Sequence, residues 1–141
     1  MTITFSTNID GFTLPDKERI KKWLTTIVQA QGKYVGTIGY LFCDDEFLLD
    51  ANRRYLNHDT YTDIITFDYV EGDLISGDIM ISVDRVGENA EKFGCTFEDE
   101  LHRVIVHGVL HLLGQGDKTE REAAEMRKKE EQALMRWQKM E

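Results

Sequence analysis

Two histidines and an aspartate in the C-terminal third of the chain have the spacing of metal ligands. His107 and His111 are four residues apart, so a helix would place both imidazoles on one face, one turn apart. Gly114, three residues after His111, can reverse the chain, and Asp117 comes six residues after His111. Helical zinc sites return a third donor to the metal by this arrangement. The spacing therefore predicts one divalent ion held by His107, His111 and Asp117.

The histidine pair alone has a second interpretation, because a buried histidine often hydrogen-bonds to the backbone without any metal. Metallopeptidases with this helical motif carry Glu directly after the first histidine as the general base. Here that residue is Gly108, so a zinc peptidase is disfavoured. We expect Gly108 to leave open space beside the ion, so that the ion or a group from another element would activate water.

The segment that carries the histidines, residues 101–114, is apolar nearly all round, which predicts a helix buried in the core. A capping box at residues 96–99 predicts its start, and a second capping box at residues 119–122 predicts a final charged helix. His102 lies five residues before His107, which turns it away from the ligand face, so we expect it to be structural. The predicted inner face of the final helix comprises Ala123, Met126, Ala133, Leu134 and Trp137.

The remaining patterns predict four strands and three further helices around this segment. The strands are expected at residues 2–9, 34–43, 63–69 and 79–81, with turns at 71–73 and 76–78. The helices are expected at about 15–32, with Pro15 in the first position, at about 44–57, and at 84–93 before Gly94. The fold class is therefore α+β, a single layer of about four strands in a mixed sheet packed with about five helices, with the metal motif on a buried helix. Residues 1–141 are expected to form one domain.

The charge of the chain argues against a large nonspecific nucleic-acid surface, because its net charge is −9. A local basic strip at Lys17, Arg19, Lys21 and Lys22 would be compatible with RNA, although the solvated face of a helix explains it as well. Cys43 and Cys95 lack a Cys-x-x-Cys spacing, and no apolar run approaches the roughly 20 residues of a membrane span. The chain is therefore expected to be cytoplasmic.

Three motifs in the same order resemble the YbeY family of ribosome-associated endoribonucleases. Residues 107–114 match every fixed place of its signature His-Gly-x-Leu-His-Leu-x-Gly, and residues 62–67 and 77–79 match its Thr-Asp-x-x-Ser/Thr-Phe and Gly-Asp-Ile motifs. The resemblance covers essentially the whole chain. It implies a metal-dependent endoribonuclease that is specific for single-stranded RNA. The implied metal is zinc, or another transition metal such as nickel. The implied role is maturation of small-subunit (16S) ribosomal RNA and ribosome quality control, with RNA and the small subunit as partners and neither DNA nor membrane.

Two positions depart from the family pattern. The third ligand is usually histidine, whereas ungapped counting puts Asp117 there, and an alignment with one inserted residue would put Lys118 there instead. Carboxylate is a proper ligand, but its charge would make the ion a milder Lewis acid. Leu56 replaces an arginine thought to face the RNA. Arg53 or Arg54, one turn earlier, could compensate, or both could be ordinary solvated residues.

Further candidates for contact with substrate lie in the loop and strand that follow. Arg54, His58 and Asp63 are the predicted substrate-facing residues. His58 could instead be an ordinary surface residue of its loop, and Asp63 could instead orient a ligand histidine or cap a strand end. Besides the peptidase, the acidic charge leaves a second rival function open. In that alternative the chain is a non-catalytic ribosome assembly factor whose metal is structural.

Overall fold

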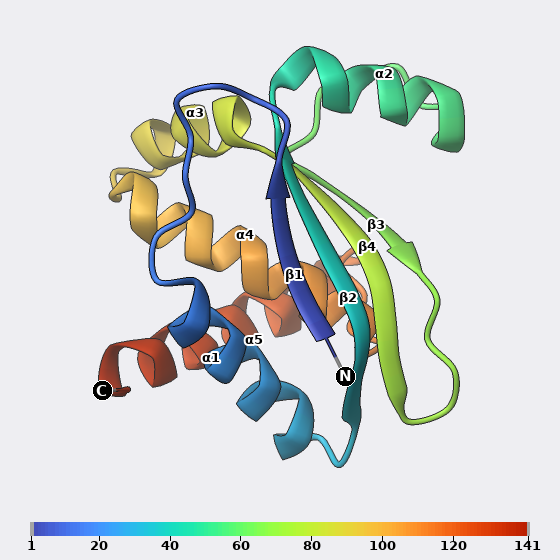
Figure 1. Cartoon of the computed structure of the whole chain (residues 1–141), viewed down its shortest axis with the longest axis vertical. Coiled ribbons are helices and arrows are strands. Elements are labelled where there is room, and N and C mark those ends of the chain that lie inside the picture. The colour runs from blue at the N-terminus through green and yellow to red at the C-terminus, as the bar shows by residue number, and fades with distance from the viewer. Residues whose placement is uncertain (1, 141) are drawn as a thin grey trace.

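The computed structural model describes residues 2–140, which form a mixed four-stranded sheet and five helices (Figure 1). In chain order the elements are β1 (Thr2–Thr7), α1 (Lys17–Ala30), β2 (Tyr34–Cys43), α2 (Asp45–Leu56), β3 (Ile64–Asp68), β4 (Leu74–Ser82), α3 (Val83–Phe93), α4 (Phe97–Leu112) and α5 (Glu120–Lys139). The strand order is β1-β2-β4-β3, with only β3 antiparallel to its neighbour. The predicted α+β class, with a four-stranded mixed sheet and five helices, is confirmed, and so is the order of the elements.

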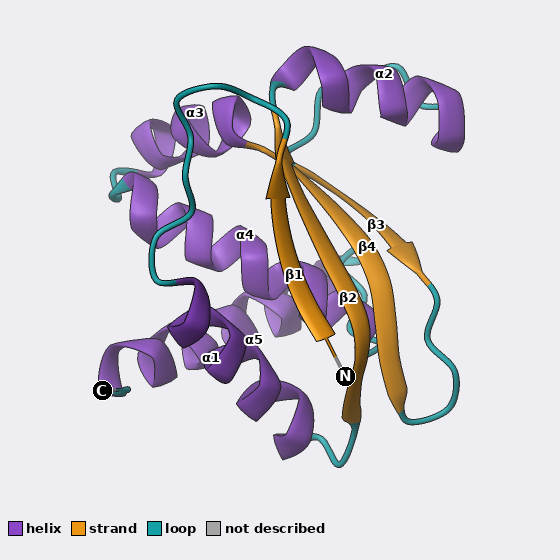
Figure 2. Cartoon of the chain, in the orientation of Figure 1, coloured by secondary structure: helices purple, strands orange, loops and turns teal. Residues whose placement is uncertain are grey.

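The helices cover the two faces of the sheet unequally (Figure 2). Helix α4 packs against β3 and β4, α1 packs against β2, and α5 packs against α4. Helix α2 lies over the opposite face, where its residues Leu48 and Ala51 bury Ile65 of β3 in a smaller apolar cluster. The main core lies between the sheet and the α1, α4 and α5 layer. Among the described residues, no helix is both long and apolar enough to cross a bilayer.

The helix boundaries follow local capping chemistry. The hydroxyl of Thr96 accepts a hydrogen bond from the Asp99 amide, and that of Thr119 accepts one from the Glu122 amide. Glu122 returns a bond to the Thr119 amide, which completes the predicted capping box at α5. At α4 only the threonine half of the box forms. Gly94 ends α3 with φ 70°, in the left-handed region that glycine adopts without strain.

Three details of the predicted elements are wrong. Pro15 is not the first residue of a helix, because α1 begins at Lys17 after Asp16, whose φ is 59°. The fourth strand is longer than 79–81, since Gly77 and Asp78 of the expected turn pair with both β2 and β3, and only the register with β2 shifts, between Ile75 and Gly77. Ala123 is exposed, whereas Met126, Ala133 and Trp137 are buried as expected and Leu134 is partly buried. The first turn of α5 therefore projects beyond the core.

His102 is a core residue, as predicted from its place on α4. Its side chain is 2% exposed, and its ring lies 4.3 Å from the ring of Trp137 and 5.9 Å from that of Trp23, between centroids. Burial lowers the pKa of His102. As the pH falls, the unfolded chain therefore binds this proton before the folded chain does, and the neutral ring stabilises the fold only at higher pH.

We expect the wild-type chain to lose stability more steeply than His102→Gln as the pH falls below about 6.5, the ordinary value for histidine. Glutamine cannot titrate, and the other titrating groups are common to both chains, so the difference isolates His102. Urea unfolding of both chains from about pH 8 to about pH 5 measures it. Equal pH dependence in the two chains would contradict the assignment.

Candidate functional site

His107 lies between two carboxylates that come from different parts of the chain. Its Nδ1 is 2.6 Å from Oε2 of Glu130 on α5, and its Nε2 is 3.3 Å from Oδ2 of Asp117 in the loop between α4 and α5. Glu130 is buried and Asp117 is exposed. The ring is thus held from the inside of the protein and faces an accessible carboxylate on the outside.

The loop after α4 returns Asp117 to the helix that it has just left. Gly114 has φ 101°, a backbone conformation that disfavours residues with a side chain. The buried side chain of Gln115 donates hydrogen bonds to the carbonyls of Gly116 and Glu122, which ties the loop to α5. The chain reversal predicted at Gly114 is therefore present, and it brings Asp117, not the exposed Lys118, to His107.

The spacing of His107 and Asp117 suits two donors on one ion. Tetrahedral donors about 2.0–2.1 Å from zinc lie roughly 3.4 Å from one another, close to the 3.3 Å between Nε2 and Oδ2. His111 is one helical turn further along α4 and partly buried. Within residues 2–140, no three His, Cys, Asp or Glu side chains are grouped closely enough to hold a metal. Of the three predicted ligands, the structure brings His107 and Asp117 together.

The electrostatic surroundings of His107 favour a positive charge on the ring. Burial lowers its pKa, but the hydrogen bond to Glu130 and the charges of Glu130 and Asp117 outweigh burial, so the pKa is raised overall. Glu130 also receives an ion pair from Arg103, whose Nη1 is 3.1 Å from Oε1. A cation at Nε2, whether a proton or a metal ion, therefore meets a favourable field.

Asp63 is the substrate-facing candidate that lies beside His107. Both line a cavity of about 230 Å³, and Asn89 of α3 donates a hydrogen bond of 3.4 Å to the Asp63 carboxylate. Burial raises the pKa of Asp63, and the charge of His107 partly offsets this effect. Among the described residues Asp63 makes no hydrogen bond to a histidine, so the partner that holds His107 is Glu130 instead.

The other two substrate-facing candidates lie elsewhere. Arg54 is exposed on α2 and pairs with Asp50 of the same helix at 3.0 Å. His58 is exposed in the loop after α2, and the neighbouring Arg53 pairs with Asp59. No hydrogen bond or ion pair joins Arg54 or His58 to His107, His111 or Asp117 in the described part of the chain. The structure does not bring them together with the histidines.

Gly108 does not leave open space beside the histidine, contrary to the expectation from its size. A Cβ at this position would lie 2.9 Å from Cδ1 of Ile79 and 3.2 Å from Cδ1 of Ile64. The missing side chain therefore allows α4 to approach β3 and β4 closely. Gly108 therefore has a packing role. By allowing α4 to lie close to the sheet, it sets how deeply the neighbouring His107 is buried.

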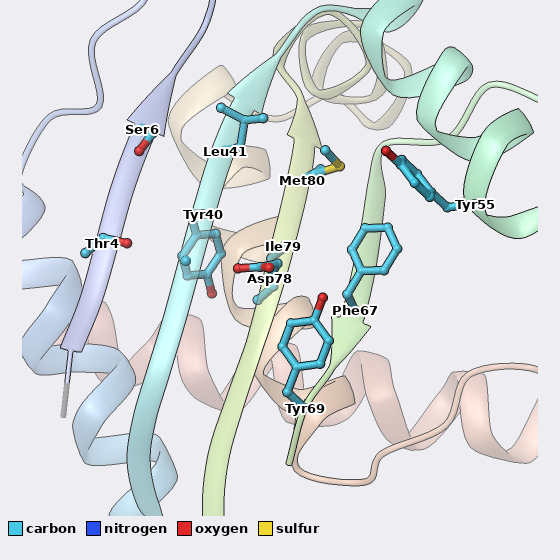
Figure 3. Close-up of a pocket in the computed structure, with 11 residues that line it drawn as sticks. Thr4, Ser6, Tyr40, Leu41, Tyr55, Phe67, Tyr69, Asp78, Ile79 and Met80 are labelled. Atoms are coloured by element: carbon cyan, nitrogen blue, oxygen red, sulfur yellow. The ribbon is translucent and has the colours of Figure 1, made fainter.

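A larger hollow of about 620 Å³ lies on the other face of the sheet (Figure 3). Asp78, Ile79 and Met80 of β4 line it, and the Ile79 side chain also packs toward Gly108 on α4. The exposed rings of Tyr55 and Tyr69 rim the hollow, and none of the predicted metal ligands lines it. The His107 site and this hollow are thus separated by the sheet.

Two residues of the His107 site were not predicted, Glu130 and Arg103. Glu130 falls in register with the buried residues Met126, Ala133 and Trp137 of α5, so a charged residue on an apolar helical stripe was the available signal. Arg103 lies four residues before His107, on the same face of α4. Neither pattern by itself identifies the partner, because the crossing of α4 and α5 decides it.

Comparisons with known proteins find the same family over nearly the whole chain. A family model described as endoribonuclease YbeY matches residues 5–138. The endoribonuclease YbeY of Bacteroides thetaiotaomicron is 48% identical over 136 residues, which cover 95% of this chain and 98% of the relative. That of Porphyromonas gingivalis is 51% identical over 128 residues, covering 89% and 85%. The solution structure of TM1509 from Thermotoga maritima superposes with a TM-score of 0.67 at 28% identity, covering 97% and 92%.

We expect Gly108→Ala to lower the free energy of unfolding by up to about 2 kcal/mol, because the added methyl group overpacks α4 against β4 at a cost of about 1–3 kcal/mol, and a helix-propensity gain of up to about 1 kcal/mol offsets only part of it. The control is Gly87→Ala on α3, where the nearest atom to an added Cβ, Cδ1 of Phe97, is 3.9 Å away. There, helix propensity predicts a gain of up to about 1 kcal/mol. Urea unfolding measures both variants, and equal effects would refute the packing role of Gly108.

Proposed function

The chain belongs to the endoribonuclease YbeY family, and from this premise we propose that it is a metal-dependent, single-strand-specific endoribonuclease that matures the 16S RNA of the small ribosomal subunit. The observation that carries the metal dependence is the approach of His107 Nε2 to Asp117 Oδ2, at a separation that suits two ligands of one ion. Its substrate is RNA, and the small subunit is its proposed partner. Residues 1–141 act as one catalytic domain in the cytoplasm, where ribosomal RNA is processed.

The proposed ligands are His107, His111 and Asp117, and the proposed ion is zinc, with nickel or another transition metal as a substitute. Imidazole nitrogen and carboxylate oxygen are donors that zinc accepts, and both histidines are on one helix at a four-residue spacing. When bound, such an ion polarises a phosphodiester oxygen or lowers the pKa of water. Asp117 in place of a histidine would make that ion a milder Lewis acid.

The residues around the ligands would bind and orient the RNA. Asp63 lines the same cavity as His107. Its raised pKa suits a carboxyl group that transfers a proton to, or donates a hydrogen bond to, a group near the reacting phosphate. Arg54 and His58 are exposed, so we propose that they contact RNA phosphates from the loop region after α2. Because the whole chain is acidic, these contacts would be few, and the small subunit would hold the RNA in place.

Chelation of the ion and His111→Ala should each reduce cleavage of single-stranded RNA by more than about 100-fold, since loss of an outer partner alone typically costs 10–100-fold. The zinc content of the purified proteins and their thermal unfolding are measured in parallel. A folded His111→Ala chain that still cleaves RNA at the wild-type rate would refute the ligand assignment.

The two rival functions give different results in the same assays. A chain that leaves RNA intact but co-sediments with the small subunit in a zinc-dependent way is an assembly factor. A chain that leaves RNA intact but cleaves peptides is a peptidase. The sequence disfavours this outcome, because the residue after His107 is not Glu.

Asp117→Ala should reduce both zinc binding and RNA cleavage, whereas Lys118→Ala should leave both near the wild-type level. The two residues are adjacent and exposed in the same loop, so the pair of variants controls for disturbance of the loop. Zinc affinity is measured by competition with a chromophoric chelator. The opposite pattern, in which only Lys118→Ala reduces cleavage, would show that Asp117 is not the third ligand.

A further inference from the structure

We infer that Glu130 is a positioning residue for His107: it fixes the ring proton on Nδ1, and the Nε2 lone pair then faces Asp117. The part of this inference that concerns metal affinity rests on the proposed function. The part that concerns the tautomer of His107 stands on the two contacts of its ring with Glu130 and Asp117. Glu130 would touch neither substrate nor ion, and it acts only through the imidazole of His107.

The two contacts of the His107 ring differ in strength. The 2.6 Å between Nδ1 and Oε2 of Glu130 is the length of a short, charge-assisted hydrogen bond. The 3.3 Å between Nε2 and Oδ2 of Asp117 is longer than an ordinary nitrogen–oxygen hydrogen bond. A neutral imidazole has one N–H donor, so it donates to the closer, buried carboxylate. Nε2 is left as the acceptor, the state in which it can bind a metal.

Glu130 is itself held from two sides. Glu130 is only 6% exposed, and each of its carboxylate oxygens contacts a different residue of α4. Oε1 is 3.1 Å from Nη1 of Arg103, and Oε2 contacts Nδ1 of His107. Arg103 and His107 are four residues apart, so they present both contacts on one face of the helix. Rotation of the carboxylate away from the imidazole would break a buried ion pair, which is costly. The orientation of Glu130 is therefore restrained before any ion binds.

The position of Glu130 along α5 is fixed by apolar and polar contacts further along that helix. Ala133 and Trp137 are buried on the same stripe as Glu130. Nε1 of Trp23 donates a 2.8 Å hydrogen bond to the Ala133 carbonyl, and the Arg19 side chain donates to the Trp137 carbonyl at 2.6 Å. These bonds join α5 to α1. The docking of the C-terminal helix thus determines where the carboxylate meets His107.

A carboxylate on the far nitrogen of a ligand histidine usually raises its basicity and fixes its tautomer, and loss of such a partner costs about 10–100-fold in metal affinity. We therefore expect a weakening of that size for zinc in Glu130→Ala. The matched control is Glu131→Gln, the adjacent residue of α5. Glu131 pairs with Arg103 at 2.5 Å but forms no hydrogen bond or ion pair with His107 among the described residues. That variant should bind zinc as the wild-type chain does.

The direct test is the tautomer of His107 in metal-free, ¹⁵N-labelled protein, measured by long-range ¹H–¹⁵N NMR at a pH above the titration of this ring. In the wild-type chain and in Glu131→Gln the proton should be on Nδ1, and in Glu130→Ala the signal should shift to the Nε2–H form or to a mixture. A wild-type ring with its proton on Nε2 would overturn the inference, even if Glu130→Ala failed to fold.

The zinc measurement separates this inference from the proposed function. If the wild-type chain binds no zinc, the metal proposal fails, while the NMR result still decides the role of Glu130. If His111→Ala loses zinc but Glu130→Ala keeps both wild-type affinity and the Nδ1–H tautomer, the metal proposal stands and Glu130 is only a packing partner. A tautomer shift together with an affinity loss in Glu130→Ala, and neither in Glu131→Gln, supports the inference.

Discussion

The interaction on which the site depends is the buried contact between His107 and Glu130. An apolar helix such as α4 is stable inside the protein only if its polar groups find partners there. The polar groups of His107 and Arg103 find a shared partner in the carboxylate of Glu130, which accepts a hydrogen bond from each of them. Polar residues that would destabilise a core separately are thereby tolerated as a connected set. The site is a consequence of how α4 becomes buried.

The sheet and the loop after α4 convert this contact into an accessible site. Gly108 lets α4 lie close to β3 and β4, which sets how deeply the His107 ring sits. At the end of α4 the left-handed Gly114 turns the chain back, and Asp117 reaches the outer nitrogen of the same ring. One imidazole is therefore shared between a carboxylate in the core and a carboxylate at the surface. The same ring links the interior packing to the solvent side.

Local sequence signals predicted most of the fold and only the outer half of the site. The element order, the buried α4, the threonine caps and the return of Asp117 depend on residues that are near in sequence, and they were predicted. The errors arose where tertiary contacts override a local preference. Pairing with two neighbours extends β4 through Gly77-Asp78, and close packing against Ile79 explains Gly108. Glu130 is 23 residues from His107, so only the helix crossing could identify their contact.

The distribution of charge gives a physical reason for a cation at this place. The negative charges of Glu130, Asp117 and Asp63 each raise the pKa of His107 and so favour a positive charge on its ring. Arg103 offsets only part of this charge, because it also pairs with Glu131. A polyanion such as RNA would be repelled by an uncompensated cluster of this kind. A divalent ion between His107 and Asp117 would neutralise this cluster, so in an acidic protein the ion would remove the local repulsion of phosphate and offer it a cation to bind.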